Sequence, residues 1–161
     1  PECLEGGPVL VYRTEPFERH TEISGPLALY LLGCADQPET HWIVKVLDED
    51  AKGGTRVLTK GWLRGTHRAI DAERSRPWRP FHPHREREPL VPGEPTEFPI
   101  EIWPMSNVFM AGHRLRLDIA ACDSPAFDLP FAHYPYGRVV TNIVYEGGPQ
   151  GSKLLVPLIP S

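Results

Sequence analysis

Charged and apolar residues alternate along the segment from Gly112 to Ala120, which reads GHRLRLDIA. Successive side chains of a β-strand point to opposite faces of a sheet, so the pattern predicts a half-buried strand. Leu115, Leu117 and Ile119 would face the core, and Arg114 and Arg116 would face outward. His113 shares the buried face at the edge of this strand, where its ring can bond a carbonyl or a carboxylate. We therefore expect a structural histidine there.

Short apolar runs separated by turn residues fill most of the remaining chain. Nineteen prolines and 14 glycines leave few stretches as long as an ordinary helix of about 11 residues. The pattern favours about eight or nine short strands in an all-β sandwich or jelly roll. The predicted strands are 9–13, 21–32 with an interruption at Gly25-Pro26, 41–48, 56–68, 96–103, 113–121, 139–145 and 153–158.

Residues 71–93 differ from the rest because they combine prolines and many charges with no periodicity. Such a composition is typical of a long loop that crosses the surface. We expect Trp78 and Phe81 to pin this loop to the body of the protein.

Length, charge and hydropathy narrow the class of protein. A chain of 161 residues with 40% hydrophobic residues fits one domain, residues 1–161. The formal net charge of −4 argues against nucleic acid as a partner, since binding to phosphates needs an excess of Lys and Arg. No run approaches the roughly 20 apolar residues of a membrane span.

Cysteines and methionines bear on compartment and origin. Cys3, Cys34 and Cys122 lie far apart and are odd in number, which favours a reduced, cytoplasmic protein, although a secreted parent stays open. The chain starts at Pro1, and its methionines, Met105 and Met110, lie deep inside it. We expect a fragment of a longer protein.

A catalytic serine is not indicated by the sequence. The nucleophile of an α/β-hydrolase stands on a tight strand-to-helix turn within a GxSxG motif, and no serine here has that setting. Nothing near His113 supplies a nucleophile for it to activate. We expect no catalytic residue and no cofactor site in this chain.

A metal site is an alternative raised by His82-Pro83-His84 and Glu88, which have the HxHxxxE spacing of cupin barrels. Two histidines two positions apart on a strand point the same way and could share a metal. The prolines around them deny the segment the hydrogen bonds of a strand. A solvated loop without metal is the preferred interpretation.

Aromatic and basic side chains suggest binding surfaces. Trp78, Tyr134 and Tyr136 lie in predicted loops, where they could stack on a sugar or contact another domain. Arg64 and Arg68 open a basic stretch that could meet an acidic partner surface. Trp42 and Trp103 lie in alternating strands and are expected in the core. A free-standing carbohydrate-binding jelly roll is therefore the second functional hypothesis.

Six segments, taken in order, resemble the C-terminal non-catalytic domain of the Xaa-Pro dipeptidyl-peptidase family. That family also includes hydrolases of the cocaine esterase and α-amino-acid ester hydrolase types. The matching segments are LVYRTEP at 10–16 with EISGP at 22–26, VKVLD at 44–48, GWLRGTHR at 61–68, PLVPGE at 89–94, GHRLRL at 112–117 and SKLLVP at 152–157.

This resemblance implies a jelly-roll β-sandwich of galactose-binding-like shape that packs against the α/β-hydrolase domain of its parent chain. The catalytic triad of such enzymes belongs to the hydrolase domain. The accessory domain supports it, closes one side of the substrate cleft and, in some members, helps subunits associate as homo-oligomers. Activity would be of the dipeptidyl-peptidase or acyl-esterase type, and absent from this chain alone.

Two segments depart from the family pattern. Glu39-Thr40-His41-Trp42 replaces an Asp-rich DxDf segment, which puts in doubt any role that needs its second aspartate. Residues 127–136, FDLPFAHYPY, replace an RNPN-like loop. We assign no ligand to that loop.

Overall fold

Eight β-strands provide most of the regular structure in the computed structural model, which describes residues 9–121, 140–148 and 150–160. No α-helix occurs in these residues, and accordingly none could cross a membrane. The elements are β1 (Leu10–Arg13), β2 (Thr21–Ala35), β3 (His41–Glu49), β4 (Thr55–Arg64), the 3₁₀ turn η2 (Gly65–His67), β5 (Thr96–Phe109), β6 (Arg114–Ala120), β7 (Asn142–Val144) and β8 (Lys153–Leu155). Each strand overlaps a predicted one.

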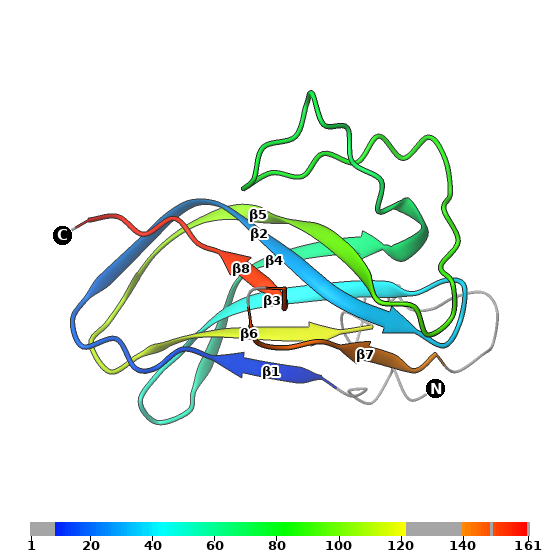
Figure 1. The fold of residues 1–161 in the computed structure, drawn as a ribbon. Coiled ribbons are helices and arrows are strands. Elements are labelled where there is room, and N and C mark those ends of the chain that lie inside the picture. The colour runs from blue at the N-terminus through cyan, green and yellow to red at the C-terminus, as the bar shows by residue number, and fades with distance from the viewer. Residues whose placement is uncertain (1–8, 122–139, 149, 161) are drawn as a thin grey trace, which may run out of the picture.

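The strands form one antiparallel sheet that curls back over itself. Their order is β1-β6-β3-β4-β5-β2-β7, and β8 pairs with β2 beside β7. Figure 1 shows β1, β6 and β3 below β2 and β5. We call β1, β6, β3 and β4 the β6 layer, and β5, β2, β7 and β8 the β2 layer. Inner side chains of both layers form one hydrophobic core, among them Val44, Val46, Leu117, Leu29, Phe98 and Ile100. The all-β sandwich is confirmed.

Strand β6 follows the predicted alternation along its whole length. Leu115, Leu117 and Ile119 are buried, and the residues between them are half-buried on the outer side. The Nδ1 atom of His113 lies 2.8 Å from Oδ1 of Asp48, a buried residue of β3. His113 is thus the structural histidine that the sequence predicted.

Strands β2 and β5 continue past prolines at which we expected them to break or end. Gly25 pairs with Met105 and Leu27 pairs with Ile102, so one residue of β2, Pro26, faces two of β5, Trp103 and Pro104. This β-bulge places both prolines where the ladder is already interrupted, so their missing N–H groups leave no pair broken. The expected break at Gly25-Pro26 and end at Trp103 were therefore wrong.

A tight turn joins β3 to β4. The Asp50 carboxylate accepts hydrogen bonds from the backbone N–H groups of Lys52 at 2.7 Å and Gly54 at 2.9 Å. These bonds, that from Gly54 first, lower the pKa of Asp50. The turn keeps β3 and β4 paired from Glu49↔Thr55 onward.

The two layers meet on the β4 side at a single paired position, Gly61↔Ile102. A Cβ atom added to Gly61 would lie 2.5 Å from the carbonyl oxygen of Glu101, closer than real Cβ atoms approach backbone. The absence of a side chain at Gly61 is what lets β4 and β5 come together.

Residues 68–95 contain no helix or strand, as predicted for 71–93, apart from an isolated bridge between Arg76 and Arg79. Trp78 does not pin this loop, because its side chain is 50% exposed. The ties come from its neighbours: the Tyr30 hydroxyl donates to Pro77 O at 2.9 Å, and Arg79 Nε bonds Glu101 at 3.1 Å. The loop therefore lies beside the outer side of the β2 layer, above β5 in Figure 1.

Replacing Gly61 by alanine tests the contact between the layers. We expect Gly61→Ala to lower the free energy of unfolding by about 1–3 kcal/mol, because the new methyl group meets backbone that cannot move cheaply. Thr55→Ala, at an exposed position of the same strand, is the control and should change stability much less. Chemical denaturation measures both; equal effects would contradict this role of Gly61.

Candidate functional site

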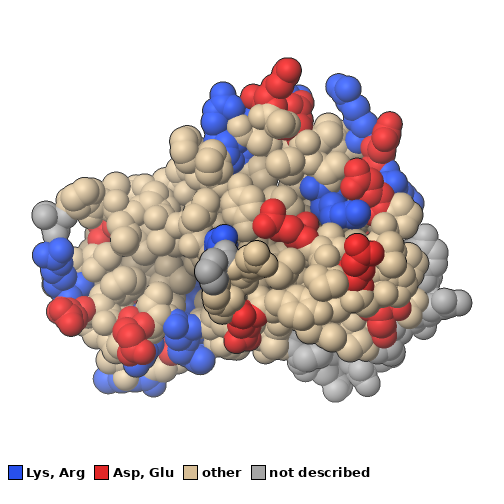
Figure 2. All heavy atoms as spheres, viewed as in Figure 1, with Lys and Arg blue, Asp and Glu red and all other residues tan. Residues whose placement is uncertain are grey.

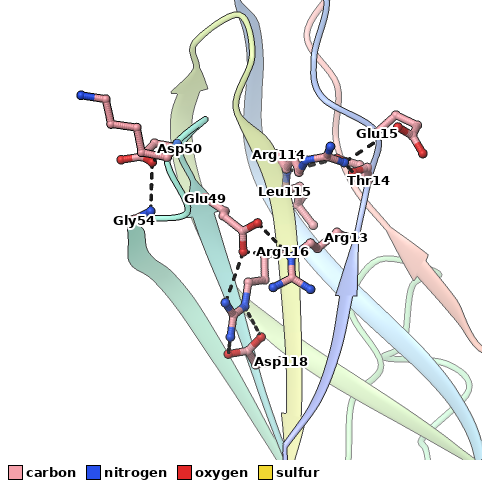
Figure 3. A network of polar contacts seen from close by, with 11 residues as sticks. Arg13, Thr14, Glu15, Glu49, Asp50, Gly54, Arg114, Leu115, Arg116 and Asp118 are labelled. Carbon is pink, nitrogen blue, oxygen red and sulfur yellow. Dashed lines mark hydrogen bonds and ion pairs between the residues drawn. The ribbon is translucent and has the colours of Figure 1, made fainter.

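The outer side of the β6 layer carries a closed network of ion pairs, drawn in Figure 3. Arg116 bonds Asp118 through Nε at 2.6 Å and Glu49 through Nη1 at 3.2 Å. Arg13 Nε lies 2.8 Å from the same Glu49 carboxylate. Asp118 and then Glu49 raise the pKa of Arg116, and Arg13 lowers that of Glu49. Because these charges satisfy one another, this side needs no partner to neutralise them.

The outer side of the β2 layer is different, because large apolar side chains lie exposed on it. Trp103 is 67% exposed, Val108 49%, Leu155 36% and Ile159 44%. We call these four residues the apolar face. Figure 2 shows a broad uncharged area in its left half, where Figure 1 places the C-terminal segment and the adjoining parts of β2 and β5.

Strand register places the members of the apolar face on neighbouring strands. Val108 of β5 pairs with Glu22 of β2, and the backbone N–H of Ile159 donates to Glu22 O on the opposite edge. Leu155 of β8 pairs with Ala28, which pairs in turn with Glu101 of β5. The four residues thus lie on the same outer side, on three adjacent strands or segments, with the exposed Glu22 between Val108 and Ile159.

Trp103 was expected in the core, and that prediction was wrong. The inward residues of β5 before the bulge are Phe98, Ile100 and Ile102, all fully buried. Trp103 follows Ile102 directly and must point to the other side. It packs edge-on against Trp62 of β4, with 5.7 Å between ring centroids. Trp42, the other tryptophan expected inside, is 3% exposed and confirmed in the core.

Trp78 lies at the rim of the apolar face. Its neighbours Pro77 and Arg79 bond Tyr30 of β2 and Glu101 of β5. Glu101 lies in the same row as Leu155, and Tyr30 lies two residues along β2 from that row. This tryptophan is exposed beside the Arg79–Glu101 ion pair. Tyr134 and Tyr136, the other two aromatic candidates, lie outside the described residues.

Arg64 and Arg68 take part in contacts within the chain. Arg64 Nε donates to Glu39 at 2.8 Å, and the Thr66 hydroxyl donates to the same carboxylate oxygen at 2.8 Å. Arg68 bonds the carbonyl oxygen and forms an ion pair with the carboxylate of Glu88. Both arginines thus hold η2 and the adjoining loop, and their predicted contact with a partner stays a prediction.

Glu39 connects the start of β3 to η2. Burial favours the neutral acid, but the hydrogen bonds from Thr66 and Arg64 outweigh it and lower the pKa of Glu39. Glu39 is the first residue of the segment 39–42, which departs from the family pattern. Its carboxylate therefore has a structural role in this chain.

His82 and His84 do not share a metal in this arrangement. The ring nitrogens of His82 lie 3.0 Å from Ala69 O and 2.8 Å from Pro99 O, so both already face backbone oxygens. His84 is exposed, with a φ of 53°. No group of three or more His, Cys, Asp or Glu residues with metal-binding geometry occurs within residues 9–121, 140–148 and 150–160.

Cys34 is buried and makes no disulfide, and its Sγ lies 3.5 Å from the Tyr145 hydroxyl. Cys3 and Cys122 lie outside the described residues.

Three members of the apolar face, Val108, Leu155 and Ile159, were not identified from the sequence. The sequence of β5 did contain a sign of the exposed position of Val108. After Trp103, apolar residues occur at positions that point to both faces of the sheet, so some of them had to lie on the outer side.

Comparison with known proteins identifies the family. Residues 2–155 match the family described as "X-Pro dipeptidyl-peptidase C-terminal non-catalytic domain". The chain belongs to this family. The resemblance noted from the six sequence segments is therefore confirmed.

Relatives include larger proteins named as esterases. "Putative serine esterase Mb1866c" of Mycobacterium bovis is 30% identical over 156 residues, which cover 94% of this chain and 24% of that protein. Cocaine esterase of Rhodococcus is 26% identical over 126 residues, covering 74% of this chain and 19% of the enzyme. The chain thus spans about a quarter or less of these relatives.

A solved structure shows the same fold. The crystal structure of a CocE/NonD family hydrolase from Staphylococcus aureus superposes with a TM-score of 0.82 at 22% identity. The match covers 94% of this chain and 30% of that hydrolase.

Replacing His82 tests how the loop is held. We expect His82→Ala to make the arginines of residues 68–95 more susceptible to trypsin, because the ring no longer bridges Ala69 and Pro99. The loss of a hydrogen bond from the ring to one of these carbonyl oxygens should cost about 1 kcal/mol. His84→Ala is the matched control, since that exposed ring lies on the same loop. Equal cleavage rates in the two variants would contradict the bridging role.

Glu39 should contribute to stability in a pH-dependent way. Its pKa in the folded protein is below the usual 4.5, so its contribution is present above that pH and is lost as pH falls through the lower folded value. In Glu39→Gln the free energy of unfolding should depend less on pH below 4.5 than in the parent protein. Urea titrations from pH 7 to 3 measure this; parallel curves would rule out the assignment.

Proposed function

We propose that this chain is the accessory domain of a larger serine hydrolase of the esterase or dipeptidyl-peptidase type. In this proposal it supports the catalytic α/β-hydrolase domain, borders the substrate cleft and performs no catalysis alone. The family match supports the non-catalytic role, and the names of the relatives support the class of parent enzyme.

The apolar face is the observation that carries the supporting role. Exposed apolar residues on three adjacent strands or segments are typical of a surface that packs against another protein part. Burial of a side chain such as Trp103 contributes about 2 kcal/mol. The opposite outer side carries the satisfied ion pairs, with Val57 as an exposed apolar residue among its strands. We therefore assign the contact with the catalytic domain to the apolar face.

Trp78 supports the second element of the proposal. It lies beside the apolar face on a loop fastened to β2 and β5, so a domain docked there would meet it at the edge of the interface. A loop in that position can form part of a cleft between two domains. In the carbohydrate-binding hypothesis, the same exposed ring would instead stack on a sugar, and a glycan array separates the two ideas.

The absence of catalysis is tested on the chain itself. Incubation with a fluorophosphonate probe should leave every serine unlabelled, and p-nitrophenyl acetate and Ala-Pro-p-nitroanilide should not be hydrolysed above background. The full-length mycobacterial relative serves as the control for ester hydrolysis. Labelling at any serine would overturn the proposal.

The interface is tested in a chimera in which this chain replaces the matched region of the mycobacterial relative. We expect Val108→Ser to lower the temperature at which esterase activity is lost, because the substitution puts a hydroxyl into an apolar contact. Val57→Ser is the matched control: Val57 is 47% exposed, against 49% for Val108, but lies on the outer side of the β6 layer. Equal losses would exclude the apolar face as the interface.

A further inference from the structure

A cavity of about 390 Å³ lies where the curled sheet does not close. β1 and β7 stand at the two ends of the strand order, and no ladder joins them in the described part of the chain. The cavity is bounded by β1 and β6 on one side and by β2, β7 and β8 on the other. Cavities of roughly 300–1,000 Å³ at the mouths of β-barrels are common small-molecule sites.

Aliphatic side chains form the wall of this cavity. Leu115, Leu117 and Ile119 come from β6, and Leu29 and Leu154 come from β2 and β8. Because such a wall offers water few hydrogen-bond partners, an apolar group would replace water there favourably. The interior therefore selects an aliphatic or aromatic group.

The rim of the cavity carries a carboxylate. The Tyr12 hydroxyl donates a hydrogen bond of 2.7 Å to Oε1 of Glu146, linking β1 to the segment after β7. Burial, and then this bond to the Glu146 carboxylate, raises the pKa of Tyr12 to about 12, so the hydroxyl stays a donor at neutral pH.

Charge at the rim favours a cation. The other charged residue in the lining, Arg13, is already paired with Glu49 on the outer side of the β6 layer. The hydrogen-bond partner of Glu146 within the described residues is a neutral hydroxyl and not a cation. A protonated nitrogen arriving at the rim would therefore meet a carboxylate that no cation among the described residues pairs with.

We propose that this cavity binds a primary amine that carries an aliphatic or aromatic group. The apolar part occupies the space between Leu117 and Leu154, and the ammonium group donates to Glu146 beside Tyr12. This site belongs to the domain itself and is separate from the proposed contact with a catalytic domain, because the apolar face lies on the opposite side of the β2 layer.

Isothermal titration of the 161-residue chain with octylammonium, octanol and octanoate tests the ligand class. We expect octylammonium to bind at one site, about two- to fivefold more tightly than octanol, because an ion pair with the exposed Glu146 carboxylate contributes up to about 1 kcal/mol. Octanoate should bind still more weakly, because its charge repels Glu146. Absence of octylammonium binding, or octanoate binding as tight as octylammonium, would overturn the proposal.

Variants locate the site. Glu146→Gln should weaken octylammonium binding about two- to fivefold and leave octanol binding unchanged. Leu154→Trp should abolish binding of both by filling the cavity, whereas Leu155→Trp, on the outer side of the same strand, should leave both intact. A melting curve of each variant verifies folding. Binding that survives Leu154→Trp in a folded protein would place the amine elsewhere and contradict the inference.

Discussion

The close approach of β4 and β5 at Gly61 is the constraint on which the sandwich depends. The two layers share one sheet, and the pair Gly61↔Ile102 is the point at which the β6 layer passes into the β2 layer. Ile102 is fully buried, and the Glu101 carbonyl occupies the space that a side chain at position 61 would need. Separation of the strands here would open the core, because Val44 and Phe98 lie in different layers of it.

The two outer sides of the sandwich differ in the residues that they expose. Along the β6 layer, Arg13, Arg116, Glu49 and Asp118 pair with one another, and Val57 is exposed on the same side. Along the β2 layer, Trp103, Val108, Leu155 and Ile159 are exposed beside the charged residues Glu22, Glu97 and Lys153, and Glu101 is turned toward the loop through Arg79. The proposed contact with a catalytic domain is assigned to the β2 layer because its exposed apolar residues outnumber those described on the other side.

The alternation of apolar and polar residues within single strands explains what could be predicted from the sequence. In β6 the period of two is unbroken, so both its faces and the structural role of His113 followed from the residues. Trp103 was wrongly predicted to lie in the core. Phe98, Ile100 and Ile102 fix the inward positions of β5, and the prediction did not take them into account. The prolines hid the length of β2 and β5, because a bulge that absorbs two prolines depends on the pairing of distant strands.

Contacts between residues far apart in the chain lay beyond sequence reasoning. Tyr12 and Glu146 are separated by 134 positions, and neither has a motif that would connect it with the other. The cavity beside them exists because β1 and β7 end the strand order without pairing. Only the folded arrangement brings a carboxylate, a hydroxyl and a wall of aliphatic side chains together between β1 and β7.

The Asp50 turn has a consequence for how the molecule folds. β3 and β4 are joined by five residues, whereas the other strand pairs are separated in sequence by much longer stretches. Closing a long loop costs chain entropy before the strands that it joins make stabilising contacts. All-β domains of this kind therefore fold on a scale of about milliseconds to seconds. We expect the β3–β4 hairpin to form early and to serve as the template on which β6 and β5 assemble. Mutations in the Asp50 turn would then slow folding more than they speed unfolding, and the reverse result would exclude this order.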